Sequence, residues 1–91
     1  MNYSKKIKKK DTVFSQEIDG EVVLLDMASE NYFGMDAVGS DIWRLLQEGK
    51  TLQETYDVLR KDYDVTSEQL KHDLEAFVGR LLGSGLVAVI D

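Results

Sequence analysis

The sequence predicts an α+β fold of the winged helix-turn-helix type, in which an N-terminal three-stranded antiparallel sheet is followed by three helices. Two strand-like runs flank Asp19 and Gly20, a dipeptide that favours a tight hairpin. Thr51 and Thr66 each open an amphipathic helical pattern. A short turn over residues 62–65 joins the last two helical patterns, which is the order of elements in that fold.

The predicted hairpin pairs residues 12–18 with residues 21–27. Asp19 and Gly20 accept positive φ at both central positions of a two-residue turn, which is the geometry that such a hairpin requires. Residues 22–25 are apolar without alternation. This pattern predicts that the second strand is covered on both faces.

A third short strand is predicted over residues 31–35. Alternation sends Tyr32 to one face of the sheet and Phe33 with Met35 to the other, so one face is aromatic and points outward if the other packs on the core. Gly34 has no side chain, which indicates either a close approach by another backbone or a β-bulge. This strand is therefore a candidate for contact with another chain.

The three helices are marked by their ends. The first begins near Asp36, whose carboxylate can accept from free backbone amides, and ends near Gly49. The second and third each open with a capping box, in which a threonine and a residue three positions later satisfy backbone amides reciprocally. The two boxes run from Thr51 to Glu54 and from Thr66 to Gln69. The third helix is expected to end near Gly85.

Apolar side chains cover an arc of about 140° on the third helix, which is wider than a single contact requires. They are Leu70, Leu74, Phe77, Val78, Leu81 and Leu82. Trp43 lies in the apolar stripe of the first helix and is expected to complete the core. Residues 86–90 have strand composition, although a tail packed on the core would fit them equally well.

The charge distribution divides the chain. Residues 1–10 hold five lysines and no acid, whereas the remaining residues carry a net charge of −11. Because charge runs are commonly solvated, we expect a disordered basic tail over residues 1–11 and one folded domain over residues 12–91. A specific docking or nucleic-acid role for the tail is the alternative. The acidic body favours basic partners.

Composition argues against several classes of function. The chain has no cysteine and a single histidine, His72, so thiolate chemistry and a transition-metal site are not expected, and no cofactor is predicted. No catalytic constellation is recognisable, so we do not expect an enzyme. No run approaches the roughly 18 apolar residues of a membrane span and no signal-peptide core follows the lysines, which predicts a cytoplasmic protein without membrane contact.

DNA binding is the main alternative function to consider for a winged helix-turn-helix fold. A helix that reads DNA needs basic and amide side chains, because phosphates supply most of the affinity. Residues 67–84 instead carry a net charge of −1, so no nucleic-acid partner is expected. Asp73 and Arg80 lie two turns apart on one edge of this helix, where they either bracket a ligand or are solvated.

An ordered set of motifs resembles the PqqD-like family over residues 12–90. The motifs are Gly20-Glu21, Leu24-Leu25-Asp26, Tyr32-Phe33-Gly34-Met35-Asp36, Gly39, Ile42-Trp43, Leu45-Leu46, Gly49, Asp73, Phe77, Leu81 and Gly85-Leu86. The chain departs mildly from relatives, which often have a proline in the loop before the third helix and Leu-Asn where this chain has Met35-Asp36.

The resemblance implies a non-catalytic recognition element for ribosomally made, modified peptides. Such an element binds the leader of a precursor peptide, which adds as a strand to the third strand and packs against the third helix, and presents it to a leader peptidase or another maturation enzyme. A separate domain with its own basic tail favours the lasso-peptide type. A chaperone for a radical-SAM enzyme and a winged-helix DNA-binding regulator are the alternatives. A monomer or weak dimer is expected.

The expected peptide-binding residues come from the third strand and the third helix. They are Glu30, Asn31, Tyr32, Phe33, Gly34, Met35, Ser67, Leu70, Lys71, Asp73, Leu74, Phe77, Val78 and Leu81.

Overall fold

The computed structural model describes residues 1–90 and places them in three helices and two antiparallel sheets. One sheet pairs β1 (Lys6–Lys9) with β5 (Val87–Ile90). The other has the order β2 (Val13–Ile18), β3 (Glu21–Asp26), β4 (Asn31–Gly34). The helices are α1 (Ala37–Gln47), α2 (Leu52–Asp62) and α3 (Ser67–Gly83). The α+β class and the three-stranded sheet before three helices are therefore confirmed.

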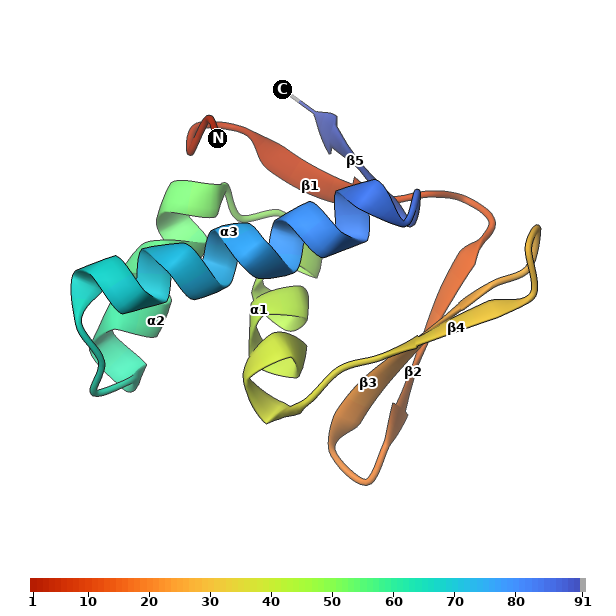
Figure 1. Ribbon diagram of the computed structural model, residues 1–91, viewed down its shortest axis with the longest axis horizontal. Helices are drawn as coiled ribbons and strands as arrows, with labels where there is room; N and C mark the ends of the chain where they lie inside the picture. The colour runs from red at the N-terminus through yellow and green to blue at the C-terminus, as the bar shows by residue number, and fades with distance from the viewer. Residues whose placement is uncertain (91) are drawn as a thin grey trace.

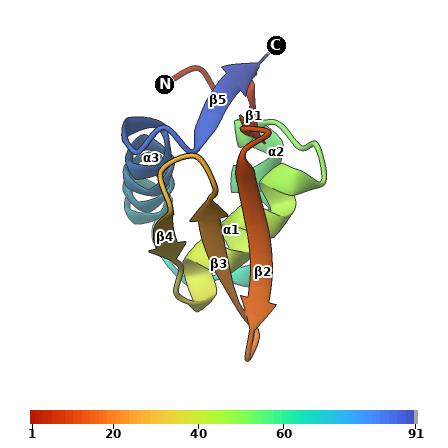
Figure 2. The same cartoon turned by 90° about the vertical axis from the view of Figure 1, so that its right-hand side faces the viewer.

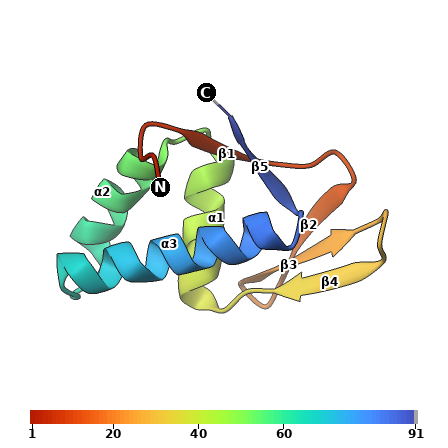
Figure 3. The same cartoon turned by 45° about the horizontal axis from the view of Figure 1, so that its top comes forward.

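The two sheets lie on different sides of the helices. Figure 1 shows β1 and β5 crossing above α1 and α3, while the three-stranded sheet extends beyond the first turn of α1. Figures 2 and 3 both place β4 at the edge of its sheet that lies nearest to α3. The edge strand and the third helix therefore lie on the same side of the molecule (Figure 2).

The β2–β3 hairpin turns as predicted. Asp19 and Gly20 have φ values of 52° and 83°, so both central residues are left-handed. Arg44 of α1 holds the hairpin, because its Nη2 donates to the carbonyl oxygen of Gly20 at 2.7 Å and its Nε donates to Glu17 at 2.7 Å. The tip of the hairpin is consequently tied to the helical layer.

The prediction that β3 is covered on both faces is wrong. Val22 and Leu24 are 2% and 0% exposed, but Val23 and Leu25 on the other face are only half-buried. In the ladder Leu25 lies between Phe14 and Tyr32, which are 58% and 75% exposed. Neighbouring side chains rather than a second layer of structure shield the outer face, so an unbroken apolar run did not require two covered faces.

The helix caps follow the sequence with one exception. Asp36 accepts from the Gly39 amide at 2.8 Å, and the capping box from Thr51 to Glu54 is complete. In α3 the Thr66 hydroxyl accepts from the Gln69 amide, but the Gln69 side chain donates to Asp73 at 2.8 Å. The second predicted box is therefore half-formed, because the Gln69 side chain is turned towards Asp73 in the next turn of α3 and does not accept from the Thr66 amide.

The prediction of a disordered tail over residues 1–11 is wrong for β1. Ile7 is 3% exposed and lies in the core, which fixes the strand against the helices. The Lys10 amide donates to the Leu86 carbonyl at 3.0 Å, and the Leu52 amide donates to the Lys5 carbonyl at 3.0 Å. One apolar side chain among the lysines, together with a pairing strand at residues 87–90, orders the segment.

The core draws on every helix and on both sheets. Its members are Ile7, Val13, Val22, Leu24, Met35, Ile42, Trp43, Leu46, Leu52, Leu59, Leu70, Leu74, Phe77, Val78, Leu81, Leu86 and Val87. Trp43 is 2% exposed, which confirms its predicted place. Among the described residues, no helix is long and apolar enough to cross a membrane.

Candidate functional site

The outer edge of β4 is open. The strand pairs with β3 over residues 31–34, and no other described strand pairs with its second edge. The Met35 amide donates to the Val22 carbonyl at 2.9 Å. Because antiparallel pairs alternate between bonded and non-bonded positions, the backbone groups of Tyr32 and Gly34 face away from β3. These two residues present free hydrogen-bonding groups at the edge.

The side chains of β4 alternate as predicted. Tyr32 is 75% exposed, Phe33 is half-buried and Met35 is 6% exposed. A methyl group built on Gly34 would meet no atom within 4 Å, and the register with β3 is unbroken there. Neither a bulge nor a close internal contact therefore explains the glycine, and the space beside it is open.

A hollow of about 340 Å³ lies between the start of α1 and the middle of α3. Its lining residues are Asp36, Val38, Gly39, Ile42, Asp73, Ala76, Phe77 and Arg80. A Cβ on Gly39 would lie 2.9 Å from Cε1 of Phe77, so the glycine allows α1 to approach α3 closely. The guanidinium of Arg80 lies 5.8 Å from the ring centre of Phe33, which connects this hollow to β4.

The rim of the hollow carries both signs of charge above an apolar floor. Asp36 is engaged as the cap of α1, and Asp73 accepts a hydrogen bond from Gln69. Arg80 has a cation–π contact with Phe33, which is worth about 0.5–1 kcal/mol at an exposed site. Asp73 and Arg80 thus line one hollow, although the sequence left open whether they bracket a ligand or are simply solvated.

The structure divides the expected peptide-binding residues into three groups. Glu30, Asn31, Tyr32, Phe33 and Gly34 lie together at the open edge, and Met35 turns inward from its end.

The apolar residues of α3 form the second group. Leu70, Leu74, Phe77, Val78 and Leu81 are between 0% and 5% exposed. The arc is therefore used by the core rather than left over, because its side chains belong to a core cluster that also includes residues of both sheets and of the other two helices. Phe77 alone of the five lines the hollow beside β4.

The third group is polar. Asp73 lines the hollow, whereas Ser67 lies exposed at the first turn of α3. Lys71 turns the other way, since its Nζ lies 5.9 Å from the ring centre of Tyr3. The structure therefore does not bring Lys71 to the β4 edge.

Several lining residues were not predicted from the sequence. Asp36, Val38 and Ala76 are the accessible ones, whereas the spacing of Asp73 and Arg80 had indicated a possible ligand between those two residues. Ala76 is a small exposed residue on a helix, for which no sequence rule indicates a binding role.

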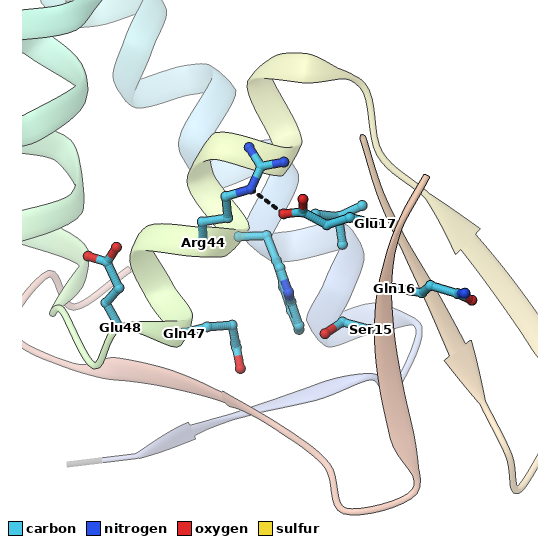
Figure 4. A pocket seen from close by; sticks show the side chains of 8 residues that line it. Ser15, Gln16, Glu17, Arg44, Gln47 and Glu48 are labelled. Atoms are coloured by element: carbon cyan, nitrogen blue, oxygen red, sulfur yellow. Dashed lines mark hydrogen bonds and ion pairs between the residues drawn. The ribbon is translucent and has the colours of Figure 1, made fainter. Parts of the chain in front are cut away.

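A second hollow, of about 390 Å³, lies between β2 and α1. Figure 4 shows Arg44 reaching across it to Glu17. The hydrogen bond from Arg44 to Glu17 raises the pKa of the guanidinium. Arg44 and Glu17 thus pair with each other, and their ion pair across this hollow ties the hairpin to α1.

No catalytic or metal-binding arrangement stands out. Within the described residues, no three His, Cys, Asp or Glu side chains are grouped as metal ligands. A hydrogen bond to Asp41, together with burial, raises the pKa of Tyr63 to about 12, but this pair joins α1 to the end of α2.

Comparisons with known proteins identify the family. Residues 21–87 match the family model of coenzyme PQQ synthesis protein D (PqqD). A solved structure described as TbiB1 in complex with the TbiA(beta) leader peptide is 44% identical, covers 88% of this chain and 93% of its own, and has a TM-score of 0.83.

A second solved structure, lasso peptide synthetase B1 complexed with the leader peptide, shares the fold. It is 22% identical, covers 91% of this chain and 98% of its own, and has a TM-score of 0.85. No curated protein sequence matches the chain. The family match spans most of the domain and the identity to TbiB1 extends over nearly all of it, and on these grounds the chain belongs to the PqqD family.

Proposed function

We propose that this protein is a non-catalytic binding protein that captures the leader of a ribosomally made precursor peptide and presents it to a modifying or leader-cleaving enzyme. The observation that carries the proposal is the open edge of β4 beside the hollow on α3. The 44% identity to TbiB1, a protein solved with a leader peptide, supports the same assignment.

The leader adds as a strand next to β4. Backbone groups of Tyr32 and Gly34 exchange hydrogen bonds with it, and the absence of a side chain at Gly34 leaves room for the incoming backbone. One leader side chain enters the hollow between Asp73 and Arg80, where Phe77 and Val38 supply apolar contact. Affinity between micromolar and nanomolar, about −8 to −12 kcal/mol, would suffice for a handover.

The lasso-peptide type is favoured over a chaperone for a radical-SAM enzyme. The support is that the two similar structures reported above are both described as complexes with a leader peptide, and one of them as a lasso peptide synthetase component. The family model itself is that of a quinone-cofactor synthesis protein, which keeps the radical-SAM partner as the second candidate. Co-purification of the chain with each class of enzyme, with leader peptide present, distinguishes them.

We also propose that the helices follow the winged helix-turn-helix arrangement. The support is that α2 and α3 are joined by only the four residues 63–66 and that the β2–β3 hairpin is tied to α1 like a wing. In this scheme the fold supplies a scaffold for the β4 edge, and the chemistry belongs to the partner enzyme.

Amide hydrogen exchange tests the binding mode. On addition of the leader of the chain's own precursor, with the TbiA(beta) leader as a second probe, protection should rise about tenfold or more at Tyr32 and Gly34. The Phe33 amide faces β3 and serves as the internal control, since its protection should change much less. Protection that appears instead along β2 or β5, with β4 unchanged, would assign the peptide to another edge and reject strand addition at β4.

A further inference from the structure

The lysine-rich segment is a rigid strand with fixed geometry. We define the lysine strand as residues 6–10. Its ladder with β5 runs from Lys6↔Ile90 to Lys9↔Val87, and Lys6 also forms a bridge with Thr51. The backbone of the strand is thus held by β5 along one edge and by Thr51 at Lys6 on the other, so a partner would meet lysines whose Cα atoms are fixed in place.

Four lysines of this strand lie outside the ion pairs formed among the described residues, although the charge of Lys6 helps to lower the pKa of Glu54. Lys6, Lys8, Lys9 and Lys10 form no ion pair with any described residue. Lys8 and Lys10 are exposed, and side chains two positions apart on one strand face lie about 6.8 Å apart. The result is a short row of cations on a protein whose residues outside this strand carry a net charge of −10.

A hollow of about 320 Å³ adjoins this row. Its lining residues are Lys6, Ile7, Lys8, Lys9, Asp11, Leu46, Gln47, Gly49 and Ile90. Ile90 is 39% exposed and gives the hollow an accessible apolar wall beside its ladder partner Lys6. Lys8 lies on the same strand face as Lys6, whereas the Nζ of Lys9 lies 6.0 Å from the ring centre of Phe14. Among the described lining residues Asp11 is the one carboxylate, against three lysines. This combination suits a ligand with several carboxylates and one apolar side chain.

We propose that the lysine strand and this hollow form a docking site for a short acidic segment of a partner protein. Carboxylates of the segment pair with Lys6 and Lys8, which lie on one face of the strand, and one apolar side chain enters beside Ile90. A duplex or a membrane extends far beyond a strand of this length and would face the acidic body, so the charge distribution favours a compact acidic ligand.

This site goes beyond peptide capture at β4. Figure 1 places β1 above the helices, on a different side from the three-stranded sheet. A partner on the lysine strand therefore leaves the β4 edge free, and the two sites can be filled together. The failure of either proposal would leave the other intact, because they use different residues and different probes.

Fluorescence anisotropy with a synthetic probe tests the docking site. The probe is a labelled eight-residue peptide of glutamates around a central phenylalanine, and its matched partner has glutamines in place of the glutamates. We expect the acidic probe to bind and the neutral one not to bind, and affinity to fall as salt rises from about 50 to about 300 mM. Replacing the phenylalanine by serine should weaken binding about threefold or more.

Two variants with the same change in net charge locate the site. Lys8→Glu should weaken binding of the acidic probe about fivefold or more. Lys61→Glu, at an exposed position of α2, should change the affinity for the probe less than about twofold. Lys8→Gln removes the cation without adding an acid and should give an intermediate loss of affinity for the acidic probe. All three variants should keep the melting temperature and the leader affinity of the parent.

Other outcomes overturn the docking proposal. Equal losses of affinity for the acidic probe in Lys8→Glu and Lys61→Glu would mean that the probe responds to net charge and not to a site at Lys8. Tighter binding of a thymidine oligonucleotide or of phosphatidylserine vesicles than of the acidic peptide would assign the strand to a different ligand. Salt-sensitive self-association that Lys8→Glu abolishes would assign it to a second copy of the chain.

Discussion

Two four-residue strands, β1 and β4, show how differently a short strand can be offered to a partner. β1 is held on both edges, by β5 and by the bridge to Thr51, and it displays charged side chains. β4 is held on one edge and has the uncharged sequence Asn-Tyr-Phe-Gly. A closed strand is recognised through side chains alone, whereas an open strand also offers its backbone.

The anchoring of β1 can be broken most strongly at Ile7. Because this side chain is 3% exposed, Ile7→Ala should cost about 2–4 kcal/mol of unfolding free energy, measured by urea denaturation. Lys8→Ala on the exposed side of the same strand is the control and should cost less than about 0.5 kcal/mol. A loss below about 1 kcal/mol for Ile7→Ala would mean that the strand is only loosely attached.

The backbone role of β4 is tested by Gly34→Pro. Proline removes the amide that faces the open edge but leaves the β3 ladder intact, and a methyl group at this position meets no atom within 4 Å. Leader affinity by calorimetry should fall about tenfold or more, the loss expected when a hydrogen bond disappears and a ring blocks the edge.

Gly34→Ala keeps the amide and is the matched control for the proline variant. It should bind the leader within about threefold of the parent. Equal losses for alanine and proline would point to the added side chain rather than to the missing amide, and would reject backbone pairing at this residue.

Ala76→Glu tests whether the leader contacts α3 beside β4. The glutamate would occupy the hollow between Asp73 and Arg80 and should weaken leader binding about threefold to tenfold, with little effect on stability because Ala76 is exposed. Ala76→Ser at the same position keeps the side chain small. It should change the leader affinity no more than twofold, which is about 0.4 kcal/mol. Unchanged binding by the glutamate variant would show that the leader does not use this hollow.

The smallest effect is expected from Tyr63→Phe, which touches neither strand. The Tyr63 hydroxyl donates to Asp41 at the junction of α1 and α2, so its loss should cost about 0.5–1.5 kcal/mol without changing either binding site. The pKa of Tyr63 is raised to about 12 by this bond and by burial.

The pH dependence of that contribution has a definite sign. Since the folded pKa lies above the unfolded value of about 10, the stabilisation is complete below about pH 10 and is lost as pH rises towards 12. The difference in unfolding free energy between the parent and Tyr63→Phe should therefore shrink over that range. A difference that persists to higher pH would contradict the assignment.

The sequence predicted the elements that local chemistry determines. Turn residues at Asp19 and Gly20, the caps at Asp36 and Thr51, and the alternation of β4 all have local signals, and the structure confirms them. The place of Trp43 in the core was likewise readable from its apolar stripe.

Long-range pairing explains what the sequence did not predict. β1 forms because Ile7 reaches the core and because residues 87–90 arrive from the other end of the chain, and a local rule for lysine runs contains neither fact. The sequence alone makes the apolar arc of α3 look wider than the core requires, because it does not show how many elements pack on that helix. The hollow at Ala76 depends on how closely α1 approaches α3 at Gly39, which is a property of the packed fold.

The unpaired edge of β4 also sets the conditions under which copies of the protein remain apart. An uncharged open edge is a template for the edge of any neighbouring molecule, and a net charge of −6 opposes such encounters by mutual repulsion. Added salt screens that repulsion but leaves backbone hydrogen bonding intact. Concentrated stocks should consequently be most monodisperse at low ionic strength or with a peptide seated on the edge.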